Sequence, residues 1–237
     1  MPRIAKWIGD AMEDLLASKI PVMKVLEIQI LSPKVKRIRF KGNLSGMNFH
    51  LGYAVAVRVS DTEYRNYTPS YSDASAGILE IVVHLHGLAP GSKLMDALKP
   101  GDELRISMPR GRKMYDSSFD KHVFFGDETS LGLALAFNTT LKNTQHLYHF
   151  YFELDECNTA IPKLLGFDNY TILPKSLFLS EAFKEIDALK SGNWLTASFI
   201  LTGNAQSVQK IRKVLTRQPR RGKIHLQAYW AEGKTGL

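Results

Sequence analysis

Three short segments carry residue types that suit a phosphorylated aromatic ligand. The first is Arg65-Asn66-Tyr67-Thr68, at the end of a predicted strand. Because alternate strand residues share a face, Arg65 and Tyr67 should point the same way. A flavin needs a cation for its phosphates, an aromatic wall for its ring and a small donor near its reactive nitrogen, and Arg65, Tyr67 and Thr68 could supply these. The same residues could equally pack as ordinary strand neighbours.

The second segment runs from His86 to Ser92 and leads into a predicted helix. Small residues such as Gly91 and Ser92 at a helix start leave backbone N–H groups open, and the helix dipole favours an anion there. A pyrophosphate would suit this place. A Pro-Gly turn with Ser92 as an ordinary N-cap is the alternative.

The third segment, residues 124–132, reads as a strand, a glycine turn and a helix capped by Thr129. This pattern is typical of the first β–α turn of a doubly wound sheet, where nucleotides bind at the carboxyl ends of the strands. It lacks the G-x-G-x-x-G spacing of a dinucleotide fingerprint, so by itself it only suggests a nucleotide site.

The elements that position these segments divide into two patterns. Residues 21–114 read as short strands separated by turns, with one helical break at residues 92–98, which predicts a six-stranded antiparallel Greek-key β-barrel. Residues 115–237 alternate strands with helices, which predicts a doubly wound, mostly parallel α/β domain. Before them, residues 1–20 have the apolar period of an amphipathic helix expected to pack on its own domain.

Composition limits the class of protein. The apolar fraction is 44% and the charged fraction 23%, as in ordinary folded proteins. No secretory signal or membrane-spanning run is evident, so we expect a cytoplasmic protein without stable membrane association. The single cysteine, Cys157, can form no internal disulfide. No His/Cys/Asp cluster indicates a metal site, since His84 and His86 lack a third partner.

The chain carries a formal charge of +8. Its densest basic run, residues 34–41, alternates with apolar residues and resembles the wet face of a half-buried strand, although it could instead attract an anionic ligand. A basic barrel could also bind nucleic acid, but no ladder of aromatic and basic residues surrounds Phe40. We therefore expect no nucleic-acid partner.

Taken in order, the motifs resemble a known family. The segments RNYT, H-G…P-G-S and GDETSLG, then Thr202-Gly203-Asn204 before a basic helix and Tyr229-Trp230 near the end, are similar to the siderophore-interacting FAD-binding proteins. These are ferric-siderophore reductases of the ferredoxin-reductase-like superfamily. The resemblance covers about Val25 to Gly233.

The resemblance implies roles for individual residues. Arg65 would contact the FAD phosphates, Tyr67 would stack on the isoalloxazine and Thr68 would lie near its N5 edge. His84 would lie beside the cofactor, and Gly91 and Ser92 would hold the pyrophosphate. The remaining implied positions line the junction between flavin and nicotinamide or approach the rings from the C-terminal side: Asp127, Thr129, Gly203, Tyr229 and Trp230.

The implied activity is reduction of Fe(III) in an anionic siderophore by NADPH or NADH through FAD, so that weakly held Fe(II) dissociates. The family favours NADPH, and Arg217, Arg220 and Arg221 could contact its phosphate. Against this, Glu153, Asp155 and Glu156 end the second predicted strand of the α/β domain, where an acidic residue typically binds an NAD ribose.

Some positions depart from the family pattern. Ser70 replaces a usual Arg, Asn204 a common Glu, and Ala231 and Glu232 the two arginines that tend to follow Tyr-Trp. These changes bear on the electron acceptor more than on flavin binding. Two alternatives therefore stay open: a reductase that donates electrons to a ferredoxin, flavodoxin or other protein, and a protein that retains FAD without turnover.

Overall fold

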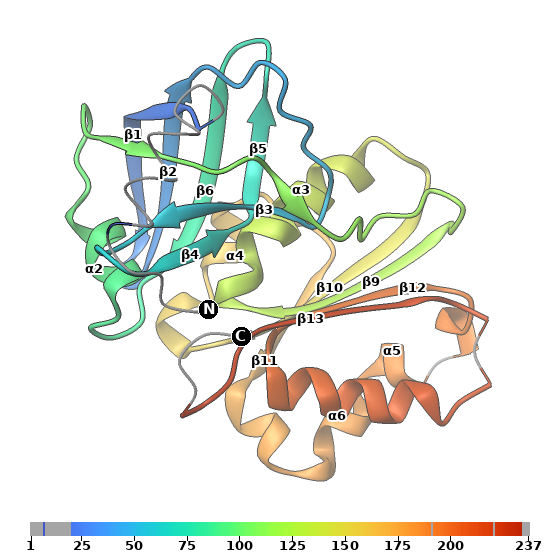
Figure 1. The fold of residues 1–237 in the computed structure, drawn as a ribbon. Coiled ribbons are helices and arrows are strands. Elements are labelled where there is room, and N and C mark those ends of the chain that lie inside the picture. The colour runs from blue at the N-terminus through green and yellow to red at the C-terminus, as the bar shows by residue number, and fades with distance from the viewer. Residues whose placement is uncertain (1–6, 8–19, 191, 220, 234–237) are drawn as a thin grey trace. The chain divides into compact units, whose positions relative to one another are not determined.

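The computed structural model describes residue 7 and residues 20–190, 192–219 and 221–233 (Figure 1). The chain forms two compact units, Met1–Lys113 and Met114–Leu237. The sequence patterns place the boundary one residue later. Apart from Trp7 and Ile20, the helix predicted over residues 1–20 lies outside the described residues.

The first unit is built from antiparallel strands and one described helix. One sheet has the order β5-β6-β2-β1-β7 and a smaller sheet the order β4-β3-β8. The elements are β1 (Val22–Ser32), β2 (Val35–Gly42), β3 (Tyr53–Arg58), β4 (Tyr64–Tyr67), β5 (Pro69–Asp73), β6 (Ile78–His84), α2 (Pro90–Ala97), β7 (Glu103–Arg105) and β8 (Arg110–Gly111).

Both sheets of the first unit contribute to one apolar core. Ile38 and Phe40 of β2 pack in the same cluster as Val55 and Val57 of β3. A bridge between Val57 and Ile106 continues the pairing from β3 to the chain after β7. The antiparallel barrel fold predicted for this part of the chain is therefore confirmed.

The barrel has more strands than the six predicted, because one predicted strand is two. β4 pairs with β3, whereas β5 pairs with β6 in the other sheet. The change of sheet falls at Thr68, between β4 and β5. Pro69, which follows, has no backbone N–H to continue a strand ladder. The short β8 is a further strand that the sequence pattern did not indicate.

The basic run on β2 is largely neutralised within the first unit. Glu80 of β6 is 1% exposed and accepts hydrogen bonds from Nε of Arg37 (2.7 Å) and Nε of Arg39 (2.7 Å). Lys36 pairs with Asp96 at 2.6 Å, and the Lys41 ammonium donates to the carbonyl of Ala76. These contacts agree with the interpretation of the run as one face of a strand.

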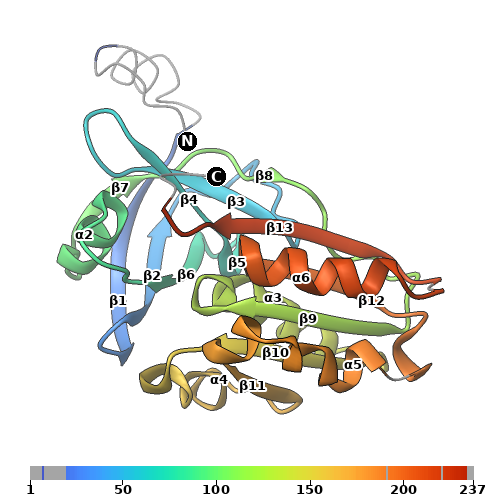
Figure 2. The same cartoon turned by 90° about the horizontal axis from the view of Figure 1, so that it is seen from below.

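The second unit is a five-stranded parallel sheet with the order β11-β10-β9-β12-β13 (Figure 2). Its strands are β9 (Lys121–Asp127), β10 (Leu147–Leu154), β11 (Tyr170–Pro174), β12 (Ser198–Asn204) and β13 (Ile224–Trp230). Its α-helices are α3 (Leu131–Lys142), α4 (Ile161–Leu164), α5 (Asp187–Lys190) and α6 (Ala205–Thr216). Short 3-10 turns are η1 (Glu128–Ser130), η2 (Glu156–Asn158), η3 (Lys175–Leu179), η4 (Glu181–Glu185) and η5 (Gly192–Trp194).

Helices cover both faces of this sheet (Figure 1). On the α3 face, Phe124 of β9 lies 5.8 Å from Phe137 of α3 and 5.5 Å from Phe150 of β10, between ring centroids. On the α6 face, Phe125 packs in one cluster with Val208 and the rest of the buried side of α6. The doubly wound parallel domain predicted for this part of the chain is confirmed.

Two details of the second unit differ from the prediction. The edge strand β13 gave no clear signal because all its residues are only half-buried. The helix predicted over residues 180–190 is divided into η4 and α5, because Ile186 has extended backbone with ψ 125°. Within the described residues, no helix is both long and apolar enough to cross a membrane.

Candidate functional site

In the first unit, strand β4 lies directly against the start of α2. A β-carbon on Gly91 would stand 2.8 Å from the Tyr67 hydroxyl oxygen and 3.1 Å from Cγ of Arg65. The side chains of Arg65 and Tyr67 thus share one face of β4, and that face meets α2. Only glycine permits this close approach of helix and strand at position 91. The first two predicted segments therefore meet in space.

Tyr67 and Arg65 are both half-buried. Burial, opposed by the neighbouring charge of Arg65, raises the pKa of Tyr67 to about 12, so its hydroxyl stays protonated. Arg65 donates from Nη1 to the Tyr64 carbonyl at 2.9 Å and from Nη2 to Glu63 Oε1 at 3.3 Å. The guanidinium is thus held along β4.

The start of α2 offers backbone donors without a side-chain cap. Ala89 occupies the N-cap position and has no side chain that could accept a hydrogen bond. The first N–H groups of a helix have no partner within the helix itself, so those of Gly91 and Ser92 suit an anion. The Ser92 hydroxyl is used differently from the N-cap alternative: it accepts from the His86 N–H (3.0 Å) and donates to the His86 carbonyl (3.2 Å).

Other predicted positions in this unit surround the same strands. Thr68 lies at the corner where the chain passes from β4 to β5, and His84 ends β6 with its ring 5.7 Å from that of His86. Ser70 is 2% exposed, and its hydroxyl has no hydrogen-bond partner among the residues described. Ser70 therefore brings no charge to the place where the family pattern has an arginine.

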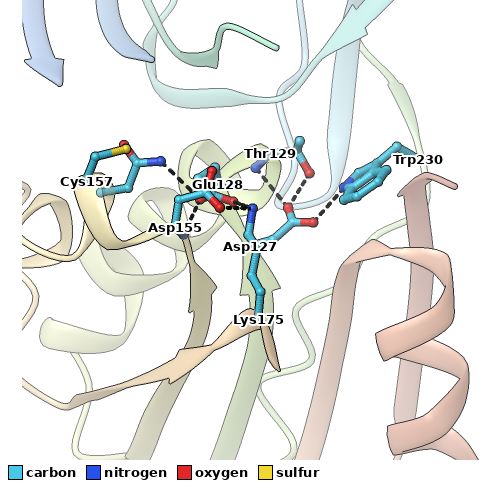
Figure 3. Close-up of polar contacts among 8 residues, drawn as sticks. Asp127, Glu128, Thr129, Asp155, Cys157, Lys175 and Trp230 are labelled. Atoms are coloured by element: carbon cyan, nitrogen blue, oxygen red, sulfur yellow. Dashed lines mark hydrogen bonds and ion pairs between the residues drawn. The ribbon is translucent and has the colours of Figure 1, made fainter. Parts of the chain in front are cut away.

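In the second unit, Asp127 is a buried cap at the end of β9, so the prediction that Thr129 is the cap was wrong: Thr129 donates to the cap instead. It is 2% exposed, and its Oδ1 accepts from the Thr129 N–H (2.9 Å) and the Thr129 hydroxyl (Figure 3). Its Oδ2 accepts from Nε1 of Trp230 at 2.7 Å. Burial raises the pKa of Asp127, although the hydrogen bonds from Thr129 and Trp230 oppose the shift. Asp127 thus joins the turn after β9 to β13 through hydrogen bonds.

The strand order reverses between β9 and β12, which makes the carboxyl ends of these strands the topological switch point of the sheet. Gly203 has φ +97°, and a β-carbon there would stand 2.6 Å from Cγ of Asp127. Next in the chain, Asn204 caps α6 by accepting from the Gln206 N–H at 2.9 Å. This cap explains why an Asn can stand where the family commonly has Glu.

Tyr229 and Trp230 are half-buried neighbours on β13. The structure therefore gathers four of the predicted residues of this unit at its switch point: Asp127, Thr129, Gly203 and Trp230. A cleft between the sheet and α6 opens beside them, with room for about one water-sized sphere, roughly 10 Å³.

An ionic cluster lies at the ends of β10 and β11 (Figure 3). The Lys175 ammonium stands 2.9 Å from Asp155 Oδ1 and 3.2 Å from Glu128 Oε2. Glu128 is 1% exposed, and its Oε1 also accepts from the Asp155 N–H (2.7 Å) and Asn158 Nδ2 (3.0 Å). Burial alone would lower the pKa of Lys175, but Asp155 and Glu128 outweigh it and raise that pKa. Sequence reasoning missed Glu128 and Lys175 as partners.

Glu153 lines the cleft from β10 and is 9% exposed. Burial, partly offset by a hydrogen bond with Ser207 of α6, raises the pKa of Glu153 to about 7. Arg217, in contrast, follows the C-terminal end of α6. The 12 residues of α6 separate it from the switch point by about 18 Å. Arg217 therefore lies at the opposite end of α6 from the switch point.

Comparison with known proteins agrees with this architecture. Residues 22–115 match the family model described as the oxidoreductase FAD-binding domain. The siderophore-interacting protein SipS from Aeromonas hydrophila superposes with a TM-score of 0.74 and 21% identity, over 92% of this chain and 94% of that one. The chain has the ferredoxin-reductase-like fold. The resemblance to siderophore-interacting proteins, drawn from the motifs, is thus confirmed for the fold.

Two further similar proteins have names that indicate other functions. NADH-cytochrome b5 reductase 1 from Mycosarcoma maydis is 29% identical over 107 residues, which are 42% of this chain and 32% of that protein. The chain thus spans about a third of the length of that curated relative. Phthalate dioxygenase reductase, described as transferring electrons from pyridine nucleotides to [2Fe-2S], superposes with a TM-score of 0.73 at 16% identity, over 92% of this chain and 70% of that one.

Proposed function

We propose that this chain is an FAD-containing, NAD(P)H-dependent reductase whose acceptor is ferric iron in an anionic siderophore. The observation that carries the proposal is the close contact of Gly91 with Tyr67 and Arg65, inside a segment that matches an oxidoreductase FAD-binding domain. The fold shared with SipS supports the siderophore as acceptor.

The residues of the first unit fit FAD. Arg65 and the backbone N–H groups at the start of α2 would bind the phosphates, because both present hydrogen-bond donors and positive charge. Tyr67 would form one wall for the flavin ring. Its hydroxyl stays protonated and would therefore form only uncharged hydrogen bonds. Thr68, at the corner between β4 and β5, would place a hydroxyl beside the ring.

Bound FAD would supply the conversion between a two-electron hydride donor and a one-electron acceptor, which no side chain of the protein provides. The second unit would hold the nicotinamide dinucleotide at the switch point between β9 and β12. Asp127 positions this region through Thr129 and Trp230, and its burial indicates a structural contribution in place of direct proton transfer. A siderophore would need only to approach the flavin, so no protein ligand to iron is required.

A visible spectrum of the purified protein, followed by anaerobic titration with NADH and NADPH, tests the reductase proposal. We expect a yellow protein whose flavin absorbance bleaches with at least one nicotinamide and returns on adding a ferric siderophore. A flavin that binds but never bleaches would support the alternative of a protein that retains FAD without turnover. A colourless protein after FAD supplementation would contradict the proposal altogether.

An electron-transfer protein is the second candidate acceptor. The fold shared with phthalate dioxygenase reductase and the match to NADH-cytochrome b5 reductase 1 favour it. Ser70, Ala231 and Glu232 also leave the chain without arginines that the siderophore-interacting family tends to have. Comparing reduction rates of several ferric siderophores with those of a [2Fe-2S] ferredoxin, a flavodoxin and cytochrome b5 decides between the acceptors. The cytoplasmic location stays a prediction from the sequence.

A further inference from the structure

Strand β1 lies between β2 and β7 in its sheet, but one of its two edges is only partly paired (Figure 2). It pairs with β2 over residues 23–32 and with β7 over residues 22–24. On the β7 side, the loop at residues 101–102 then bonds to the Val25 backbone. Among the described residues, none outside β2 forms a backbone hydrogen bond with residues 26–31. This part of β1 therefore has an open edge, which we call the β1 edge.

The β1 edge is apolar and carries little charge. Ile30 is 70% exposed and Leu26 is 44% exposed. Glu27 is the one charged residue in the sequence 26–31, and its carboxylate lies 3.9 Å from the Arg39 guanidinium. Proteins often protect an open edge with lysine or proline, and residues 26–31 contain neither. The side chains of the β1 edge therefore leave it able to pair with another strand.

Two irregularities limit the length of the β1 edge. Register shifts against β2 lie between Val25 and Glu27 and between Ile30 and Ser32, so β1 is regular between them. Bulges bend a strand and interrupt its pairing. A ladder of so few residues buries less than the roughly 1,200 Å² at which stable complexes begin. Pairing at the β1 edge would therefore be weak and would depend on concentration.

We propose that the β1 edge pairs with the β1 edge of a second copy of the chain, in an antiparallel ladder whose two-fold axis passes through Gln29. Residues opposite each other in such a ladder lie on the same face of the sheet. Ile28 of each copy would therefore lie opposite Ile30 of the other, and Glu27 opposite Leu31. The two Gln29 side chains would lie opposite each other, where one amide can donate to the other.

The side chains favour this register over its neighbours. A two-fold contact requires one residue to lie opposite its own copy. An axis through Glu27 would place two carboxylates opposite each other, which destabilises a strand pair. An axis through Ile28 would place Ile30 opposite Leu26, which lies at the first register shift. The axis through Gln29 instead pairs apolar side chains twice within the regular part of β1.

Sedimentation velocity of the full-length, flavin-loaded protein between about 5 and 500 μM tests the association, because a small interface dissociates on dilution. We expect a reversible equilibrium between monomer and dimer. Ile30→Lys should weaken the dimer about tenfold or more, since it places an ammonium opposite Ile28 of the other copy. Leu179→Lys is the matched control, because Leu179 is 85% exposed and belongs to the second unit. It should leave the dimer unchanged.

Disulfide formation tests the register, in a Cys157→Ser background because the native cysteine is exposed. Gln29→Cys should form a crosslinked dimer under mild oxidation, since residues directly opposite on antiparallel strands are within reach of a disulfide. Glu27→Cys, on the same strand, should not. In the proposed ladder its two copies are four positions apart, about 13 Å, which exceeds that reach. Non-reducing gel electrophoresis separates the two results.

The outcomes are distinct. A wild type that stays monomeric up to the highest concentration would overturn the proposal, and slow amide exchange at Ile28 and Ile30 would then show that another segment covers the β1 edge. Equal weakening by Ile30→Lys and Leu179→Lys would overturn the assignment to this surface. Crosslinking of Glu27→Cys in place of Gln29→Cys would overturn the register. Each variant must melt within a few degrees of the wild type. Flavin content and bleaching by NADH or NADPH are measured separately, so failure of the dimer leaves the reductase proposal standing.

Discussion

Gly91 stands so close to Tyr67 that a single added methyl group would lie 2.8 Å from the tyrosine hydroxyl. The contact joins two segments separated by two strands, β5 and β6, and by the turns that follow them. A helix start and an aromatic strand residue are thereby held at a fixed spacing before any ligand arrives. Such preorganisation lowers the entropic cost of binding.

Gly91→Ala should therefore weaken FAD binding by about tenfold or more, because the new methyl group forces α2 away from β4. The measurement is the ratio of bound flavin to protein after gel filtration, together with the Kd for added FAD. Adding Tyr67→Phe to this variant removes the clashing oxygen. The double variant should recover part of the packing of α2 on β4, measured as a higher melting temperature than that of Gly91→Ala alone. Flavin retention unchanged in Gly91→Ala would contradict the proposed phosphate site.

Gly203→Ala should destabilise the second unit by about 2–4 kcal/mol. The residue has φ +97°, and its new methyl group would meet the Asp127 carboxyl group at 2.6 Å. Urea unfolding followed by tryptophan fluorescence reports mainly this unit, because two of the three tryptophans, Trp194 and Trp230, lie in it and Trp7 is exposed. Gly192→Ala is the control, since nothing lies within 4 Å of its added β-carbon. Equal unfolding midpoints for the two variants would show that the strand end tolerates displacement.

Glu80→Gln should destabilise the first unit by about 2–4 kcal/mol, because it leaves Arg37 and Arg39 without their shared buried carboxylate. Urea unfolding followed by circular dichroism measures the change. Glu27→Gln removes an exposed carboxylate 3.9 Å from Arg39 and should change stability by at most about 0.5 kcal/mol. A similar effect from both substitutions would mean that burial of Glu80 contributes little.

The histidine at the start of β9 predicts a pH effect on the second unit. His122 is 1% exposed, with its ring stacked 5.4 Å from Tyr115 and 5.3 Å from His146. Burial lowers the pKa of His122 below its usual 6.5, so the unfolded chain takes up a proton first as pH falls. The stability contributed by neutral His122 is therefore present above about pH 6.5 and is lost as pH falls toward its folded pKa.

His122→Phe keeps a stacking ring without a titrating nitrogen. We expect the melting temperature of the wild type, relative to this variant, to fall between pH 7.5 and pH 5, each pH being compared pairwise. The comparison is made as a difference because Asp127 and Glu153, whose pKa values burial raises, favour folding at lower pH. A difference in melting temperature that does not vary with pH would exclude His122 as a titrating group in this range.

Local patterns in the sequence were sufficient for most of the elements and for part of the site. Strand alternation alone placed Arg65 and Tyr67 on one face, and the strand–glycine–helix pattern of residues 124–132 predicted the turn into α3, although Asp127 and not Thr129 supplies its cap. The change of sheet at Thr68 was not predictable, because it depends on β4 pairing with β3 and β5 with β6. Those partners become known only from the folded chain.

The missed features are contacts between distant residues. Lys175 and Glu128 lie 47 positions apart, on different strand ends, and nothing local in either segment indicates that they meet. The Trp230–Asp127 hydrogen bond spans 103 positions. The motif resemblance grouped both residues with a cofactor, whereas the geometry first shows them stabilising each other.

That hydrogen bond also sets an order of events during synthesis. All strands of the first unit are present once residue 111 has left the ribosome, so this unit can fold while translation continues. The central strand β9 gains its partner β12 only about 75 residues after it is made, and the donor of its cap only about one hundred residues after. Before these segments are made, the β12-facing edge of β9 has no partner strand, and the Asp127 carboxylate lacks its hydrogen bond from the Trp230 indole. Nascent chains that stall before residue 198 should thus expose this edge to chaperones and proteases, while their N-terminal half is already compact.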